Sequence, residues 1–262
     1  MNRRMHAPRW PRKAVVLAIL AVLPWRVNAQ PGFAAMSTVR FDVKYQRGVT
    51  EEEAKRVADY LQSDYEYLST TLSLDLDSRC EVRIYDAQGK YLDATAQKKP
   101  WRFALFQRGV IHVQPVEVLL RERSFEKSLS YELALAILDQ TAGKGCPRWL
   151  REAYAVYHSG MMSDLTPPVG TPVNSFADLD EGLQQNPQPP RRSDVLYLLG
   201  QTMKYFVEQY GEQKAVGVFS AFRSTEPPEK VFGSHFGADM PTIEKAWAEY
   251  IASHSEPFKS PR

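Results

Sequence analysis

The sequence is poor in the side chains that most often bind transition metals. Its 262 residues include five histidines and two cysteines. None of the four histidines after residue 29 lies at the usual spacing of zinc ligands from another histidine or from Glu132. We expect surface positions for His158 and His254, and strand or loop positions for His112 and His235. A metal site built from these side chains is kept as an alternative only.

The sequence also lacks a hydrophobic run that would span a bilayer comfortably. The apolar stretch 14–25 is shorter than the roughly 20 residues that a membrane-spanning helix needs. Basic residues without an acidic one precede it, and Val27-Asn28-Ala29 follows it with the small residues that signal peptidase recognises. We therefore predict that residues 1–29 are a signal peptide and that the protein is exported, either periplasmic or secreted. An uncleaved N-terminal anchor is the alternative.

Basic charge is scarce once this leader is removed. The full sequence has 33 basic and 31 acidic residues, which gives a net charge of +2. Six of the basic residues and none of the acidic ones lie in residues 1–29, so 27 basic residues remain against 31 acidic ones, a balance of −4. No basic field is left to attract nucleic acid or anionic lipid. We expect no nucleic acid as a partner and, after signal cleavage, no membrane.

The two cysteines, Cys80 and Cys146, are too few for a disulfide framework. The predicted export makes a single bridge between them permissible. Such a bridge would close a loop that the chain-entropy model values at about 4 kcal/mol of stability. Two buried, unpaired thiols are the alternative, and the sequence leaves both open.

Strand periodicity is confined to the first half of the mature chain. The alternation of apolar residues predicts strands over 38–45 and 80–85. It also predicts a hairpin that turns at Arg108-Gly109, with strands over 103–106 and 110–113. These segments indicate a small mixed or antiparallel sheet.

Helical periodicity begins after Thr50, which forms a capping-box pattern with Glu53 ahead of a long amphipathic helix. The second half of the chain is predicted to be mostly helical. Gly160 to Arg192 carries six prolines, and so long an unstructured stretch is often a lid or a binding loop. We expect one short helix within it, over 176–183. The other predicted helices cover 125–142, 147–157, 195–210, 212–222, 228–232 and 243–251.

The order of these elements, strands first and helices afterwards, indicates an α+β fold. About 230 mature residues of ordinary hydrophobic content can bury one substantial core. We predict a single domain over 30–255, with a sheet-containing half at 30–123 and a helical half at 124–255. Residues 256–262 are expected to form a disordered tail.

Two neighbouring helical segments carry the residues of greatest interest. The first is apolar on nearly all sides between Leu133 and Leu138, which is typical of a buried helix. Gly143 and Gly145 end it, and Pro147 suits the first turn of the next helix. A short turn of this kind predicts that the second helix folds back beside the first.

This arrangement resembles the peptidase MA-like families of gluzincin zinc metallopeptidases, over about residues 38 to 253. In those families the buried helix carries His-Glu-x-x-His, whose imidazoles bind zinc and whose glutamate is the general base. The second helix reads Pro-x-Trp-Leu-x-Glu-Gly-x-Ala-x-Tyr, and its glutamate is the third ligand. The second motif is kept here, with Ala153 in place of glycine. Its matching residues are Pro147, Trp149, Leu150, Glu152, Ala155 and Tyr157.

The first motif is degenerate, because Tyr131 and Leu135 stand at the two histidine positions. Leucine has no donor atom for a metal, and a buried tyrosine keeps its proton. Only Glu152 remains of the three expected ligands, so we predict that zinc, the cofactor of the family, is lost. Glu132 occupies the general-base position and is expected to be inactive. Beside an apolar helix it must be paired or protonated, with Tyr131, an arginine such as Arg151, or water as its partner.

The resemblance also implies a cleft between the sheet and the buried helix, with Trp149, Tyr157 and Tyr197 as candidate cleft residues. Our main hypothesis is an exported, non-catalytic pseudo-metallopeptidase that holds an extracytoplasmic peptide or protein along an edge strand. One alternative is an active hydrolase with a relocated metal or with the acid/base chemistry of its carboxylates. The other is a structural scaffold.

Overall fold

The structure is a computed structural model in which the two termini and four internal segments are not described. The predicted signal peptide and the predicted tail both lie outside the described residues, as do parts of the proline-rich stretch. Among the described helices, none has the length and hydrophobicity that a membrane-spanning segment requires. The described residues are 32–73, 75–98, 102–168, 175–185 and 191–254.

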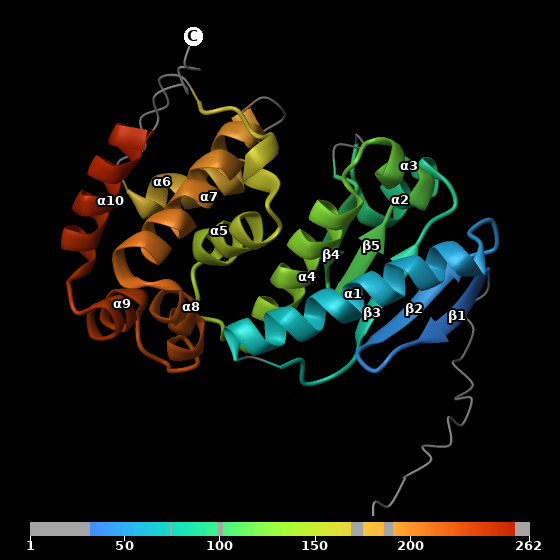
Figure 1. Cartoon of the computed structure of the whole chain (residues 1–262), viewed down its shortest axis with the longest axis horizontal. Coiled ribbons are helices and arrows are strands. Elements are labelled where there is room, and N and C mark those ends of the chain that lie inside the picture. The colour runs from blue at the N-terminus through green and yellow to red at the C-terminus, as the bar shows by residue number, and fades with distance from the viewer. Residues whose placement is uncertain (1–31, 74, 99–101, 169–174, 186–190, 255–262) are drawn as a thin grey trace, which may run out of the picture.

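A mixed five-stranded sheet forms the first half of the described chain and confirms the α+β prediction (Figure 1). Its order is β1-β2-β3-β5-β4, with parallel pairs in the middle and antiparallel pairs at both edges. β4 is therefore an edge strand. The sequence analysis missed β1. The strands are β1 (Phe33–Ser37), β2 (Phe41–Gln46), β3 (Cys80–Ile84), β4 (Ala104–Gln107) and β5 (Val110–Val113).

The predicted hairpin of β4 and β5 is confirmed. Phe106 pairs with Ile111 in the antiparallel register, and Arg108 and Gly109 form the two-residue turn. Both turn residues have positive φ, 53° and 79°, which suits the twist of the strands that they join. The turn fixes the register of β4, and the register decides which of its backbone groups face away from β5.

The long helix α1 (Glu51–Leu72) lies across the sheet (Figure 1). Its capping box forms as predicted, because Thr50 Oγ1 accepts from Glu53 N at 3.2 Å and Glu53 Oε2 accepts from Thr50 N at 2.9 Å. Its apolar face is buried against the sheet, with Leu61 and Leu68 wholly inaccessible to solvent. The helix and the sheet thus form one layered unit.

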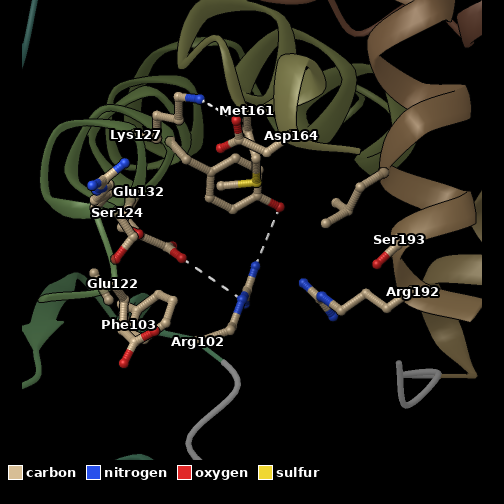
Figure 2. Close-up of a pocket in the computed structure, with 15 residues that line it drawn as sticks. Arg102, Phe103, Glu122, Ser124, Lys127, Glu132, Met161, Asp164, Arg192 and Ser193 are labelled. Carbon is tan, nitrogen blue, oxygen red and sulfur yellow. Dashed lines mark hydrogen bonds and ion pairs between the residues drawn. The ribbon is translucent and has the colours of Figure 1, made fainter. Parts of the chain in front are cut away.

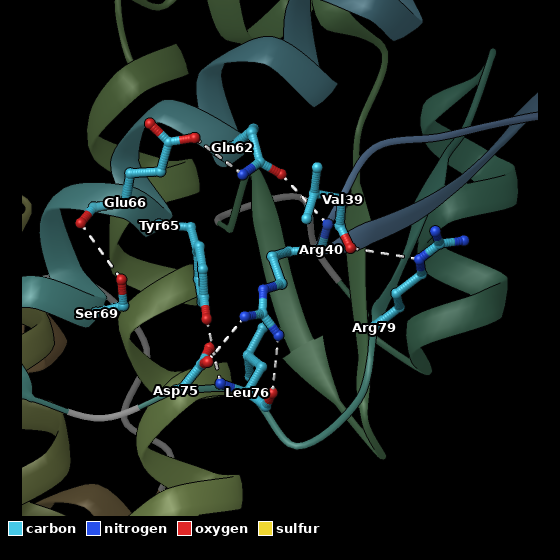
Figure 3. A network of polar contacts seen from close by, with 9 residues as sticks. All are labelled: Val39, Arg40, Gln62, Tyr65, Glu66, Ser69, Asp75, Leu76 and Arg79. Atoms are coloured by element: carbon cyan, nitrogen blue, oxygen red, sulfur yellow. Dashed lines mark hydrogen bonds and ion pairs between the residues drawn. The ribbon is translucent and has the colours of Figure 1, made fainter. Parts of the chain in front are cut away.

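Polar contacts hold the segment between α1 and β3 (Figure 3). Arg40 donates to Asp75 Oδ2 at 2.8 Å and to the Leu76 carbonyl at 3.2 Å. The Leu76 N–H in turn donates to the Tyr65 hydroxyl at 3.3 Å. Arg40 precedes β2 and Tyr65 lies on α1, so this network ties the helix to the sheet.

The second half is helical, as predicted, with α4 between the sheet and the other helices (Figure 1). Every residue of α4 from 128 to 138 is buried except Leu135. The predicted short helix of the proline-rich stretch is present as α6. The elements are α4 (Phe125–Thr141), α5 (Arg148–His158), η1 (Met161–Asp164), α6 (Phe176–Gln184), α7 (Arg191–Tyr210), α8 (Glu212–Ala221), α9 (Pro228–Phe236) and α10 (Met240–His254).

Two short helices were not predicted, α2 (Gln88–Thr95) and α3 (Val116–Arg121). Neither has a side chain that caps its first turn, so the usual start signal is missing from the sequence. Both flank the hairpin, α2 before β4 and α3 after β5. The segment between α2 and β4 carries Arg102, which proves central to the site.

The turn between α4 and α5 leaves little room for a side chain. Gly143 has φ +77°, and a Cβ placed there would lie 2.4 Å from the Phe222 carbonyl oxygen. Phe222 follows α8, so the turn is packed against the end of another helix. Glycine at this position allows α5 to fold back beside α4.

Candidate functional site

The two helices of the predicted motif bring Tyr131 and Glu152 into direct contact. Tyr131, on α4, donates its hydroxyl hydrogen to Glu152 Oε2, on α5. Both side chains are buried, 3% and 5% exposed. Leu135 follows Tyr131 by one turn on α4 and is only half-buried. The side chains at two of the positions that the resemblance assigns to metal ligands are therefore partners of each other.

Glu132 points toward the edge of the sheet. Its Oε2 accepts from the backbone N–H of Phe106 on β4 at 2.7 Å, and its Oε1 lies 3.7 Å from Arg102 Nε. At 3.7 Å the second contact is an ion pair and not a hydrogen bond. Arg151, which we expected as a partner, pairs with Asp139 at 3.0 Å instead. The partner of Glu132 is therefore an arginine, as expected, but it is Arg102 and not Arg151, whose side chain reaches the exposed carboxylate of Asp139.

Arg102 lies beside Glu132 and also contacts Tyr131, the partner of Glu152. Its guanidinium donates to the Tyr131 hydroxyl at 3.2 Å and lies 5.5 Å from the centre of the Tyr131 ring. The side chain is only 15% exposed. No motif in the sequence identified this residue. The one available signal was the requirement that a buried Glu132 have a cationic partner.

Further arginines surround the cluster. Arg148, one turn before Glu152 on α5, lies with its Nε 3.6 Å from Glu152 Oε1. Arg192, near the start of α7, points toward Arg102 (Figure 2). Three helices, α4, α5 and α7, and the segment before β4 thus contribute charged groups to one small region.

Burial shifts the pKa values of the side chains in this cluster. It raises the pKa of Glu132 to about 7, against the opposing effects of Arg102 and of the Phe106 N–H. It also raises the pKa of the Tyr131 phenol, with Glu152 acting in the same direction. Burial lowers the pKa of Arg192, and so does the positive charge of Arg102. Tyr131 is consequently a neutral phenol, as the sequence analysis expected.

These residues do not fit a zinc ion. A catalytic zinc site needs three protein ligands and an open position, whereas Leu135 has no donor atom and the Tyr131 phenol keeps its proton. The cation of Arg102 beside Tyr131 and Glu132 further disfavours a divalent metal there. Within the part of the chain that the structure describes, no three histidine, cysteine, aspartate or glutamate side chains are grouped so that they would hold a metal ion.

A pocket of about 280 Å³ opens beside the cluster (Figure 2). Tyr131 and Glu132 line its α4 side, and Arg102 and Arg192 face each other across it. Its rim carries Lys127 and Asp164, whose charged atoms lie 2.6 Å apart. Its apolar wall consists of Phe103, Ala104, Met161 and Leu196.

The three candidate cleft residues do not line this pocket. Trp149 is buried in the helical core, where its ring stacks on Phe176 with centroids 4.2 Å apart. Tyr197 is buried and accepts from Gln201 at 2.8 Å. Tyr157 lines a second, more open hollow between α1, α4 and α5. Periodicity showed that these aromatic residues were on helices, but not which helix face the pocket would adjoin.

The second hollow contains His158, for which we expected a surface position. Its side chain is only 9% exposed, and its Nε2 lies 3.1 Å from Asp64 Oδ1 on α1. The ring is stacked with Tyr67 on one helix and Tyr154 on its own. The prediction failed because α1, which is distant in sequence, covers the end of α5. His254 is exposed and His112 lies on β5, as expected, whereas His235, expected on a strand or loop, lies in the last turn of α9.

Of the two alternatives for Cys80 and Cys146, the structure shows the unpaired one, since both cysteines are free and buried. Cys80 begins β3, and its thiol lies near the carbonyl of Gly109 at the hairpin turn. Cys146 lies at the turn before α5, with its thiol near the carbonyl of Pro147. The two thiols therefore have separate surroundings. Burial raises the pKa of each to about 12, so both are protonated and unreactive at neutral pH.

Comparison with known proteins does not identify a family for this chain. No protein-family model matches the sequence, and no curated protein matches it either.

Proposed function

We propose that this chain is a gluzincin-like domain that has lost its metal and binds an extracytoplasmic peptide or protein without cutting it. The observation that carries this proposal is the contact between Tyr131 and Glu152. Two side chains at former ligand positions satisfy each other, and a pocket remains open next to them. A region that had become purely structural would be expected to fill with apolar side chains.

The pocket is a better candidate for the partner than the edge of the sheet. Addition of a peptide strand to β4 needs the N–H groups that face away from β5. At Phe106 that N–H already donates to Glu132 at 2.7 Å. A peptide that paired with β4 there would have to displace a buried carboxylate from its hydrogen bond, which opposes the edge-strand mode of our sequence hypothesis.

Hydrolysis by carboxylates is a second candidate, because the pKa of about 7 at Glu132 suits a general acid or base. The positions of its oxygens argue against it. One accepts from the Phe106 backbone and the other faces Arg102. Turnover of an unstructured protein such as casein by the wild type, lost in Glu132→Gln, would favour the hydrolase over the binding domain.

Partner binding is tested with a peptide library and a variant in which the pocket is filled. Ser124 lines the pocket, and Ser124→Trp should block it, whereas Ser63→Trp places the same side chain on the exposed surface of α1. We expect the wild type and Ser63→Trp to retain the same peptides uncut, and Ser124→Trp to lose them. The proposal is contradicted, and the scaffold favoured, if neither the wild type nor Ser63→Trp retains any peptide. Equal retention of peptides by all three proteins contradicts it as well.

A further inference from the structure

We infer that the second hollow, between α1, α4 and α5, binds an organic cation that carries N–H donors, an alkylguanidinium or an alkylammonium group. The hollow has a volume of about 570 Å³, and among the described residues it shares only Lys127 with the pocket beside α4. Its ligand is therefore independent of whether that pocket binds a peptide. Tyrosine rings, carboxylates and one carboxylate oxygen without a donor indicate this class of ligand.

Tyrosine rings line the hollow from two helices. α1 contributes Tyr60 and Tyr67, and α5 contributes Tyr154 and Tyr157. Tyr67 is 59% exposed, and its ring is stacked with that of His158 at 5.8 Å between the centroids. The faces of aromatic rings attract cations, and guanidinium groups also stack on them. A hollow with several such rings is suited to a cationic group with an alkyl stem.

Three carboxylates from three different helices also line the hollow. They are Asp64 of α1, Glu126 of α4 and Glu212 of α8. Lys127 is the one lysine or arginine among the described lining residues, and its ammonium group lies 2.6 Å from Asp164, which is outside the hollow. Even with His158 protonated, the lining has three carboxylates against two cations, one of which is neutralised by Asp164. The lining is therefore negative in sum.

The tyrosine side chains respond to this negative charge. Burial raises the pKa of Tyr60, and Asp64 and Glu126 act in the same direction. Burial also raises the pKa of Tyr157, and there Glu212 acts with it. A cation in the hollow would lower the electrostatic energy of these carboxylates.

Asp64 has a carboxylate oxygen that lacks a donor. Its Oδ1 lies 3.1 Å from His158 Nε2, and its side chain is 13% exposed. Its Oδ2 is buried and has no hydrogen-bond partner among the residues that the structure describes. Buried polar atoms are normally hydrogen-bonded, because desolvation without a partner costs free energy. An N–H group of a bound cation can supply this bond, whereas a quaternary ammonium group cannot.

Titrations followed by NMR test this assignment, with N-acetyl-arginine amide as the probe and N-acetyl-citrulline amide as its uncharged isostere. The amide signals of Tyr67 and Tyr157 report binding in the hollow. We expect the wild type to bind the arginine probe at least about tenfold more tightly at low ionic strength, because only this probe is charged. The double variant Tyr67→Ser with Glu212→Gln should lose most of this preference. Glu249→Gln, at an exposed position on α10, should behave as the wild type.

Three outcomes would overturn the inference. Equal affinity of the wild type for both probes would show that the charge is not recognised. An unchanged preference in the double variant would mean that the cation binds elsewhere. Tetramethylammonium that binds as tightly as methylguanidinium would show that no N–H donor is needed.

The source of the cation is decided by a comparison of methylguanidinium with an alanine pentapeptide that carries one central arginine. Tighter binding of methylguanidinium assigns the hollow to a small free cation. Tighter binding of the pentapeptide assigns it to a basic side chain of a peptide. Either result agrees with the inferred chemistry, whereas binding of neither compound contradicts it.

Discussion

At the scale of single residues, the candidate site is defined by hydrogen bonds and ion pairs among buried side chains. Tyr131 donates to Glu152, and Arg102 donates to Tyr131. Each buried carboxylate therefore has a donor or a cation beside it, which is what burial of a charge requires. Removing the Tyr131 hydroxyl oxygen measures how much these contacts contribute to the free energy of unfolding.

Tyr131→Phe removes the hydroxyl that serves both Glu152 and Arg102. Because Glu152 then stays buried with one donor fewer, we expect a loss of about 1–3 kcal/mol in the free energy of unfolding. Tyr60→Phe is the matched control, since it removes a hydrogen bond to Ser130, a neutral partner at a part-buried position. Urea denaturation at pH 7 measures both variants. A loss in Tyr131→Phe no larger than in Tyr60→Phe would contradict the account.

His112 should make the fold sensitive to acid. Burial lowers its pKa to about 4, and the nearby Arg83 acts in the same direction. Between pH 6.5 and pH 4 the unfolded chain binds more protons at this residue than the folded chain, so stability falls as the pH falls. Glu132 acts with the opposite sign, because its raised pKa makes the folded chain the better proton acceptor between pH 4.5 and pH 7.

His112→Gln separates the two contributions, because glutamine does not titrate and can accept the bond from Tyr85. Urea denaturation at pH 7 and at pH 5 should show the wild type losing about 2 kcal/mol more than the variant over this range. The same loss in both proteins would show that His112 is not buried in its neutral form.

The residue scale also marks the limit of the sequence analysis. The sequence established that Glu132 needs a partner, because this carboxylate lies beside an all-apolar helical run. It could not identify Arg102, which lies 30 positions earlier and comes near only through the packing of α4 against β4. It also missed the pairing of His158 with Asp64, which depends on α1 covering the end of α5.

At the scale of elements, local signals decided which helices and strands were predictable. Three features could be predicted because each depends on a short stretch of sequence, and each was confirmed. They are the capping box at Thr50, the apolar run of α4 and the Arg108-Gly109 turn. β1 was missed because its strand is defined by pairing with β2. α2 and α3 were missed because they lack side-chain caps. Where the start of an element depends on tertiary contacts, periodicity alone gives no signal.

The tight turn between α4 and α5 gives a sharp test of how those helices are positioned. Gly143→Ala should cost about 3 kcal/mol or more, because its Cβ would meet the Phe222 carbonyl at 2.4 Å in addition to the strain of positive φ. Gly237→Ala is the control, with φ +80° and no atom within 4 Å of the added Cβ, and should cost about 1 kcal/mol. Equal melting temperatures for the two variants would show that the turn can move away from Phe222.

At the scale of the whole molecule, a small mixed sheet, one long helix and a helical half share a continuous set of buried apolar residues. α4 is in contact with β4 on one side and with α5 on the other. The candidate site lies where these contacts meet, so any change in the position of α4 would alter both the charged cluster and the pocket. Our central proposal is that this region has the geometry of a zinc site without the residues that bind zinc.

The most direct test is the zinc content of the purified protein and of the double variant Tyr131→His with Leu135→His. Both substitutions lie on α4 one turn apart, and Glu152 already contacts position 131. After dialysis against micromolar zinc, we predict no stoichiometric zinc in the wild type and about one zinc per chain in the double variant. The single variant Leu135→His, with one imidazole, should bind far less. Stoichiometric zinc in the wild type, or a double variant that folds normally by circular dichroism and binds none, would contradict the claim.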